Sequence, residues 1–145
     1  MKKWTAPPAA KKSKPRKPKI DWEGNEQTVF FNWLRLQHKA AFNMAYHAPN
    51  GGNRSESEGA RLKRQGVKAG VPDVCIAIAK GGYFGLYIEF KATPPKNSAV
   101  SVSQGEWLAK LNAQGYKAVL CKGLDSIMAE VSDYLKLPAT VVEKD

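Results

Sequence analysis

Two apolar segments separated by a glycine turn constrain the fold of this chain more than any other feature. The segments span residues 71–79 and 83–91, and Lys80-Gly81-Gly82 lies between them. Short apolar runs bounded by turn residues are typical of buried strands, and glycines in a short connection are typical of a β-hairpin. We therefore predict two neighbouring strands inside a sheet.

Polar residues stand at matched ends of these two segments. Asp73 lies near the start of the first, and Glu89 and Lys91 close the second. Residues i and i+2 of a strand project from the same face, so Glu89 and Lys91 point together, and pairing of the strands would bring Asp73 beside Glu89. Carboxylates suit Mg2+ or Mn2+, and such an ion with an adjacent ammonium suits phosphodiester hydrolysis. The alternative interpretation is an exposed strand end with a surface ion pair.

The remaining elements predict an α/β fold with a mixed central sheet flanked by helices, in the order αβββαβα. Helical spacing of apolar residues indicates a first helix that Asp21 caps, and alternation then indicates a strand at Phe42–Tyr46. Ser55 begins a short basic helix. Ser103 is expected to cap the helix before a strand at 116–121, and Asp125 to cap the last helix.

Positive charge is concentrated in the residues before Ile20. Eight of the net ten positive charges lie before Ile20, at Lys2, Lys3, Lys11, Lys12, Lys14, Arg16, Lys17 and Lys19. This proline-rich segment cannot bury enough apolar surface to become ordered, so we predict a disordered basic arm over 1–19, one folded domain over 20–137 and a flexible tail over 138–145. The arm is expected to contact nucleic-acid phosphates; a solubilising tail is the alternative.

The location of the protein is also predicted from composition. The sequence has no apolar run long enough to span a bilayer and no secretory signal. Its two cysteines, Cys75 and Cys121, lie in apolar segments and are expected to be buried as free thiols. We expect a protein of the cytoplasm, in a bacterium or a phage-infected cell, with no membrane partner.

Four segments together resemble one known family. They are residues 46–54, 61–73, 88–91 and the pair Ser103-Gln104, and they include the segments that link the polar residues above. The chain resembles the VRR-NUC family, the virus-type replication–repair branch of the PD-(D/E)xK nucleases, over roughly residues 21–136. The resemblance implies a restriction-endonuclease-like core.

The resemblance also implies roles for individual residues. Asp73 and Glu89 would bind the metal together with the backbone carbonyl of Phe90, and Lys91 would hold and polarise the attacking water. Gln104 matches the family's glutamine near that lysine.

One further role is left open between two residues of the first helix. Glu26 matches the family's acidic residue on that helix, which reaches the water shell of the metal. Glu23 is the competing candidate.

Candidate phosphate-binding residues precede Asp73 in the chain. They form a loop and a basic track, with a solvated helix face as the alternative for the track: Asn50, Gly51, Gly52 and Arg54, then Lys63, Arg64 and Lys68. His47 could contact a phosphate or carry a proton, and a hydrogen-bonding role at a strand end is the favoured alternative.

The sequence thus predicts an endonuclease that cuts DNA with Mg2+ or Mn2+ and no small-molecule cofactor. The resemblance implies selectivity for branched DNA such as four-way junctions, and cutting two symmetric strands favours a homodimer. The alternatives are another PD-(D/E)xK nuclease that acts on flaps or linear DNA, and a basic nucleic-acid-binding module without catalysis.

Overall fold

A four-stranded mixed sheet forms the centre of the molecule. The computed structural model describes residues 16–50 and 54–144. The strand order is β1-β2-β3-β4, with β1–β2 and β2–β3 antiparallel and β3–β4 parallel. The elements follow the chain as α1 (Trp22–Gln37), α2 (Lys39–Phe42), β1 (Ala45–His47), α3 (Glu56–Arg64), β2 (Val74–Ile76), β3 (Leu86–Lys91), α4 (Val102–Ala113), β4 (Lys117–Lys122) and α5 (Leu124–Lys136). This confirms the predicted α/β class and mixed sheet.

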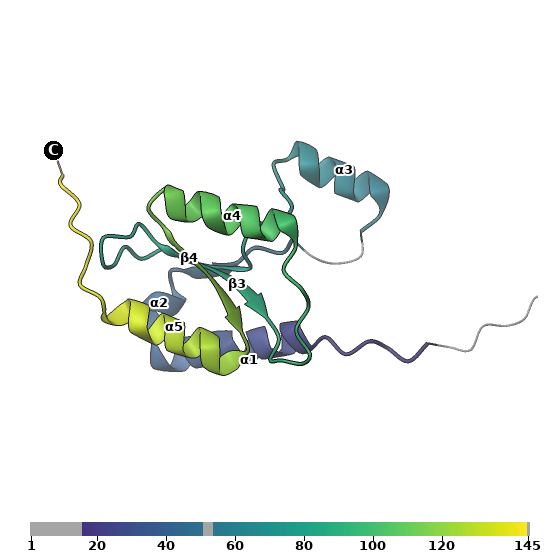
Figure 1. Cartoon of the computed structure of the whole chain (residues 1–145), viewed down its shortest axis with the longest axis horizontal. Helices are drawn as coiled ribbons and strands as arrows, with labels where there is room; N and C mark the ends of the chain where they lie inside the picture. The colour runs from purple at the N-terminus through teal and green to yellow at the C-terminus, as the bar shows by residue number, and fades with distance from the viewer. Residues whose placement is uncertain (1–15, 51–53, 145) are drawn as a thin grey trace, which may run out of the picture.

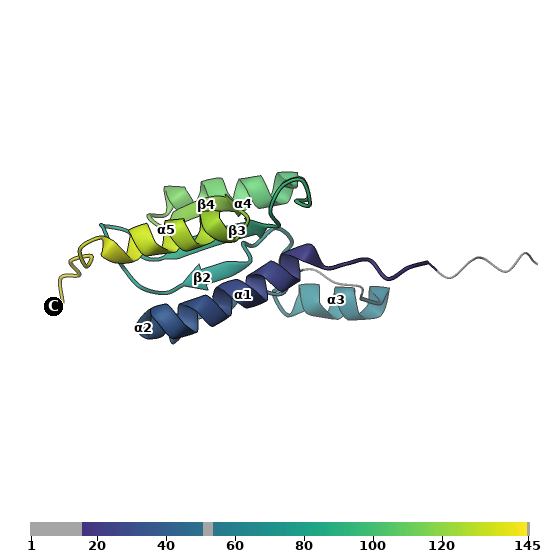
Figure 2. The ribbon, with the colours of Figure 1, turned by 90° about the horizontal axis from the view of Figure 1, so that it is seen from below.

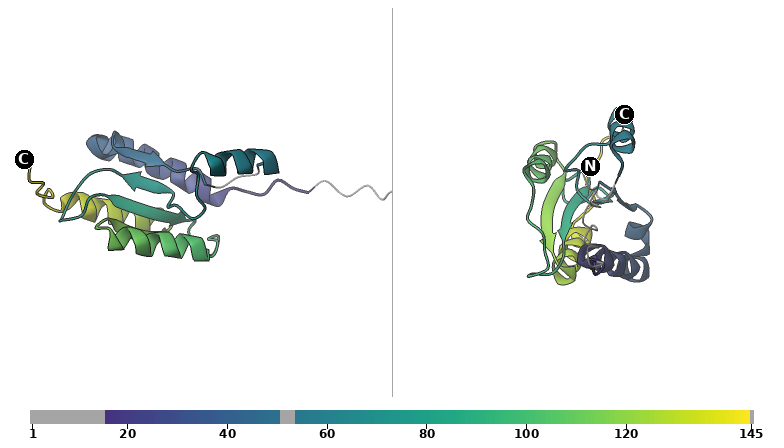
Figure 3. Two further views of the ribbon diagram at one scale, coloured as in Figure 1. Left: turned by 90° about the horizontal axis from the view of Figure 1, so that it is seen from above. Right: turned by 90° about the vertical axis from the view of Figure 1, so that its right-hand side faces the viewer.

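Helices cover the two faces of the sheet unequally. The pair α1 and α5 packs on one face, and α4 lies on the other (Figures 1 and 2). α4 packs on β3 and β4, the strands that it connects. The short helix α3 stands away from this layered body, as the end-on view shows (Figure 3). The face of β1 and β2 on the side of α4 therefore has no helix packed along it in the described part of the chain.

The main core lies between the sheet and the pair α1 and α5. Alternate strand residues point into it, among them Ile88 and Phe90 of β3, both fully buried. Tyr134 of α5 is also fully buried, and its hydroxyl donates a 2.6 Å hydrogen bond to the carbonyl of Ile78. Because a buried phenol must find a partner, this bond fixes α5 to the segment that follows β2.

Several predicted boundaries differ from those observed. Phe42 belongs to α2 and not to a strand, and β1 begins only at Ala45. Of the predicted strand 71–79, only Val74–Ile76 pairs with both neighbours. Local alternation could not show this, because strand length depends on how far the partner strand runs.

Only some of the predicted helix caps agree with the structure. Asp21 caps α1, as predicted, and its carboxylate accepts from the amide of Gly24. The prediction for α4 is wrong: Ser101, not Ser103, is its N-cap. The prediction for α5 is also wrong, since that helix starts at Leu124 with Gly123 as N-cap and Asp125 inside its first turn. In both cases the predicted cap, Ser103 or Asp125, lies two residues after the observed N-cap.

The segment before β2 is fixed against α4. Gly70 has a φ of +86°, and a Cβ on it would lie 2.5 Å from the carbonyl carbon of Ser103. Trp107 donates its indole N–H to the carbonyl of Ala69 at 3.0 Å. Only glycine allows both this φ and this close approach. The path of the chain into Asp73 is thereby tied to the start of α4.

Residues after α5 return to the connection between β2 and β3. Gly81 donates its amide N–H to the carbonyl of Pro138, and Thr140 donates its hydroxyl to the carbonyl of Tyr83 at 2.7 Å. The first part of segment 138–145 is thus hydrogen bonded to the body. None of the helices within residues 16–50 and 54–144 has the length and hydropathy of a membrane span.

Candidate active site

Asp73 is held beside β3 by hydrogen bonds to the backbone. Its Oδ2 accepts the amide N–H of Phe90 at 2.8 Å. Its own carbonyl accepts the amide of Ala48 and also lies 2.8 Å from Nδ1 of His47. This contact matches the hydrogen-bonding alternative for His47, with the proton on Nδ1. The Asp73 carboxylate is consequently fixed at the end of β3.

Glu89 and Lys91 lie next to each other on the face of β3 opposite the main core. Their exposed fractions are 1% and 4%, which is rare for ionisable residues. Glu89 Oε1 lies 3.0 Å from Lys91 Nζ in an ion pair. Oε1 is partnered by this ammonium, whereas Oε2 has no hydrogen-bond partner in the described part of the chain. A buried carboxylate oxygen that accepts no hydrogen bond is costly, so Oε2 is open to a further positive partner.

The surroundings of Glu89 disfavour its charged form. Burial, followed by the negative charge of Asp73, raises the pKa of Glu89 from 4.5 to about 7, although Lys91 opposes the shift. Glu89 and Asp73 therefore repel each other across the strand pair. A bound cation would relieve this repulsion.

The donor set fits a hard divalent cation. Asp73 and Glu89 supply carboxylate oxygens from the ends of neighbouring segments. Because N–H and C=O of one strand residue point to the same side, the Phe90 carbonyl faces the edge where its N–H meets Asp73. Mg2+ is bound through a few protein oxygens with water in its remaining positions. Within residues 16–50 and 54–144 no group of three or more His, Cys, Asp or Glu residues gathers as a metal site, so water would complete the coordination.

The first helix directs one of its two candidate glutamates to this site. The pKa of Glu23 is raised by burial and by the charges of Asp73 and Asp21, and the positive charge of Lys91 lowers it. Glu23 therefore lies within electrostatic reach of the site. The carboxylate of Glu26 instead accepts the amide N–H of Thr93 at 2.9 Å, just beyond β3.

Gln104 takes part in the cap of α4. Its Oε1 accepts the amide of Ser101 at 2.8 Å, while the Ser101 hydroxyl accepts the amide of Gln104. This reciprocal arrangement is a capping box. The side-chain carbonyl of Gln104 is thereby used in the helix cap, and its NH2 group is left to interact elsewhere.

Two residues of the candidate phosphate-binding loop donate hydrogen bonds to backbone carbonyls of the protein. Asn50 donates its side-chain amide to the carbonyl of Val71 at 2.8 Å, and Arg54 donates to the carbonyl of Pro49 at 2.8 Å. The first bond fixes the loop to the segment that leads to Asp73, and the second lies within the loop itself. Gly51 and Gly52 lie outside the described residues.

Three other candidate cations are exposed on or just after α3: Lys63, Arg64 and Lys68. Their helix has no buried residue and projects from the body (Figure 3). Glu56 and Glu58 occupy its first turn, so positive charge gathers at its carboxyl end. That end leads directly into the segment before Asp73.

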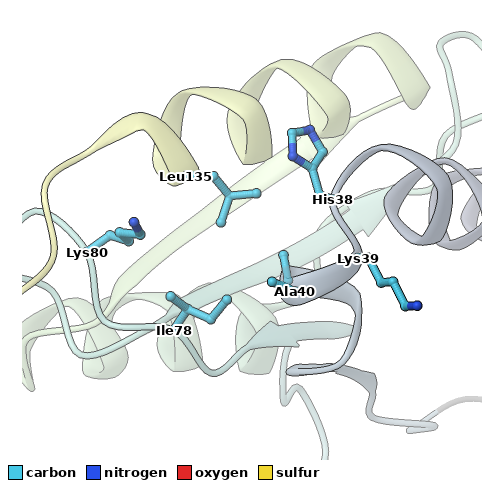
Figure 4. A pocket seen from close by; sticks show the side chains of 7 residues that line it. His38, Lys39, Ala40, Ile78, Lys80 and Leu135 are labelled. Carbon is cyan, nitrogen blue, oxygen red and sulfur yellow. The ribbon is translucent and has the colours of Figure 1, made fainter.

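A separate hollow lies at the other end of β2. It has a volume of about 400 Å3 and is lined by His38, Lys39, Ala40, Ala41, Ile78, Lys80 and Leu135. Leu135 and Ile78 lie between the side chains of His38 and Lys80 (Figure 4). Asp73 precedes β2, whereas Ile78 follows it, so this hollow is not part of the carboxylate site.

Sequence patterns gave no signal for the residues that position the site. The indole N–H of Trp107 donates to the carbonyl of Ala69, in the segment before Asp73. Gly70 has no distinguishing neighbour in the sequence, and only its contact with Ser103 shows why glycine is needed. Both contacts join residues far apart in the chain.

Comparison with known proteins agrees with this geometry. The family profile described as the VRR-NUC domain matches residues 21–125. A solved structure described as a VRR_NUC domain protein superimposes with a TM-score of 0.72 at 36% sequence identity, covering 88% of this chain and 100% of that chain. No curated protein matches the sequence. The matched region contains the carboxylates, the lysine and the segments that hold them.

Proposed function

Because the chain belongs to the VRR-NUC family of nucleases, we propose that it hydrolyses DNA phosphodiester bonds with Mg2+ or Mn2+ at Asp73, Glu89 and Lys91. One observation carries the proposal. The buried carboxylate of Glu89 is paired with Lys91 through Oε1, leaves Oε2 without a hydrogen-bond partner, and feels the negative charge of Asp73. An ion pair that served stability alone would leave no such open acceptors.

The ion would be held by Asp73, Glu89 and the Phe90 carbonyl. When bound, it would polarise the phosphoryl oxygen and lower the pKa of a coordinated water. Lys91 would donate a hydrogen bond to the attacking water and offset negative charge that develops on the phosphate. The water oxygen attacks phosphorus and the bond to the ribose oxygen breaks; the family resemblance favours a 5′-phosphate on one end.

Glu23 is the residue of the first helix that we assign to the water shell of the ion. Its electrostatic contact with Asp73 and Lys91 supports this choice. Glu26 was the first choice from the family pattern; its Oε2 accepts the amide N–H of Thr93, which holds that oxygen just beyond the end of β3. Glu23→Gln should therefore reduce cleavage far more than Glu26→Gln, which should mainly affect stability.

Gln104 requires a test that separates its two roles. Gln104→Glu keeps an oxygen acceptor for the Ser101 amide and so preserves the capping box. It also removes the NH2 donor and adds negative charge near the start of α4. A role in catalysis predicts lower cleavage with unchanged unfolding, whereas a cap alone predicts unchanged cleavage.

The substrate is proposed to be branched DNA cut by a homodimer. The family resemblance favours a four-way junction, and two strands related by symmetry require two sites related by a two-fold axis. The exposed cations of α3 and the basic arm would contact backbone phosphates. The proposed location is the cytoplasm of a bacterial or phage-infected cell.

Cleavage and ion binding together test the proposal. Purified protein with Mn2+ should nick a four-way junction, and Asp73→Ala or Lys91→Ala should abolish nicking while DNA binding persists. Isothermal titration should detect a divalent site that Glu89→Gln removes and the exposed control Glu106→Gln keeps. Unchanged nicking by either site variant would refute the assignment. A panel of flapped and linear substrates separates the other nuclease specificities, and the absence of any divalent site would favour a binding module without catalysis.

A further inference from the structure

Four aromatic side chains follow one another across the sheet. Tyr87 of β3 meets Tyr116 at 5.2 Å between ring centroids, and Tyr116 meets Phe84 at 5.9 Å, both edge to face. Tyr46 of β1 is in register with Cys75, which is in register with Tyr87. The row thus runs from the edge strand β1 to the start of β4.

The row is open to solvent where aromatic side chains are usually covered. Tyr46 and Phe84 at its two ends are 52% and 59% exposed. α4 covers β3 and β4 on this face, but no helix packs along β1 and β2 there in the described residues. Large apolar surfaces left in the open mark interaction sites.

Tyr46 of β1 and Tyr87 of β3 lie on either side of Cys75 of β2. Hydrogen bonding with Cys75, followed by burial, raises the pKa of Tyr46 above its usual value. Burial, followed by the nearby Cys75, raises the pKa of Tyr87 as well. Cys75 itself is buried. Both phenol groups therefore stay protonated near neutral pH, so the row offers uncharged ring surface.

The row continues directly into the proposed active site. Tyr87, Glu89 and Lys91 are alternate residues of β3 and project from one face. At about 3.3 Å of rise per residue, the Cα atoms of Tyr87 and Glu89 are about 7 Å apart. A strand held at Asp73 and Glu89 would therefore have aromatic surface beside the next nucleotides.

We propose that Tyr46, Tyr87, Tyr116 and Phe84 form a stacking surface for unpaired nucleobases of the strand held at the carboxylate site. The proposal rests on the proposed function for the identity of that strand. Bases offer their faces to a protein only where they are not stacked inside a duplex, as at tails, flaps and opened branch points. Stacking on aromatic rings accepts any base and is worth about 1–3 kcal/mol per base. The surface would thus select DNA with unpaired nucleotides next to the scissile phosphate.

Binding measured on the full chain without divalent cations tests this surface apart from cleavage. The probes are a fluorescently labelled blunt duplex, the same duplex with a short unpaired tail, and that tail with abasic residues. Tyr46→Ala and Phe84→Ala should each weaken binding of the tailed duplex about tenfold or more, equivalent to at least about 1.4 kcal/mol, and change blunt-duplex binding less than about twofold. The abasic tail should bind the wild-type protein as weakly as the variants bind the normal tail.

Matched variants serve as controls for these binding measurements. Tyr46→Phe keeps the ring and should retain tail binding. Leu36→Ala removes a 69% exposed apolar side chain from α1, on the other side of the sheet, and should have no effect. Urea unfolding and sedimentation of every variant check folding and oligomeric state. If Tyr46→Ala does not fold, binding by Phe84→Ala alone tests the proposal, because Phe84 is exposed.

Three results would overturn the proposal. Equal losses on blunt and tailed duplexes would show a general DNA surface, and full binding of the abasic tail would show that bases are not read. A shift in oligomeric state with no change in tail preference would identify the row as an interface between copies of the chain. Failure of the wild-type protein to cleave any DNA would refute the proposed function but leave this binding result standing.

Discussion

Glu89→Gln should stabilise the metal-free protein at alkaline pH while it abolishes metal binding. The wild-type carboxylate is buried, carries a pKa of about 7, and must be charged above that pH beside Asp73. Glutamine has nearly the same shape and carries no charge. The substitution therefore removes an electrostatic cost that a catalytic site bears when its ion is absent.

The magnitude follows from the difference between the folded and unfolded pKa. The pKa rises from 4.5 to about 7, and each unit corresponds to about 1.36 kcal/mol. Between these two values the folded state binds more protons than the unfolded state, so wild-type stability falls as pH rises through this window. The full cost, about 3 kcal/mol, is reached only above pH 7. Below pH 4.5 it is absent.

Urea unfolding in EDTA at about pH 5 and about pH 8.5 measures the effect. At the lower pH most of Glu89 is protonated in the folded state, so wild type and Glu89→Gln should differ little. At the higher pH the variant should be more stable by about 2–3 kcal/mol. Addition of Mg2+ or Mn2+ should then stabilise only the wild-type protein, because an ion that binds the native state alone shifts unfolding by mass action.

Glu106→Gln is the matched control, since Glu106 is an exposed glutamate of α4. It should leave stability unchanged at both pH values and leave the response to divalent ions intact. An equal change for Glu89→Gln at both pH values would refute the charge argument. So would a variant less stable than wild type at about pH 8.5, because Glu89 would then be a net stabilising partner of Lys91.

Three further outcomes test the parts that support the site. Gly70→Ala should destabilise the protein by about 1–3 kcal/mol and weaken ion binding, because its φ is +86° and its Cβ would contact Ser103; an unchanged urea midpoint would contradict the close approach. Tyr134→Phe should cost about 1–2 kcal/mol in urea unfolding without altering ion affinity, since it leaves the carbonyl of Ile78 without its donor. Deletion of residues 1–19 should lower DNA affinity and flatten its dependence on salt, with cleavage at saturating substrate retained; equal salt slopes would exclude a role of the arm in phosphate binding.

The sequence determined the chemistry of the site because strand geometry is local. The alternation of side chains fixes Glu89 and Lys91 on one face, and the structure places both there, buried and 3.0 Å apart. The position of Asp73 at the head of the preceding segment was sufficient to predict its place beside β3. The caps at Asp21 and Ser55 were also predictable, because both depend on residues within one turn.

Tertiary structure decided the features that depend on partners distant in the chain. The choice between Glu23 and Glu26 could not be made from helical spacing, because three residues along a helix change direction only modestly. It depends on Thr93, which binds Glu26, and on the charges of Asp73 and Lys91, which act on Glu23. The aromatic row is likewise absent from any local pattern. Tyr46, Tyr87 and Tyr116 become neighbours only when strands separated by long stretches of chain pair in register.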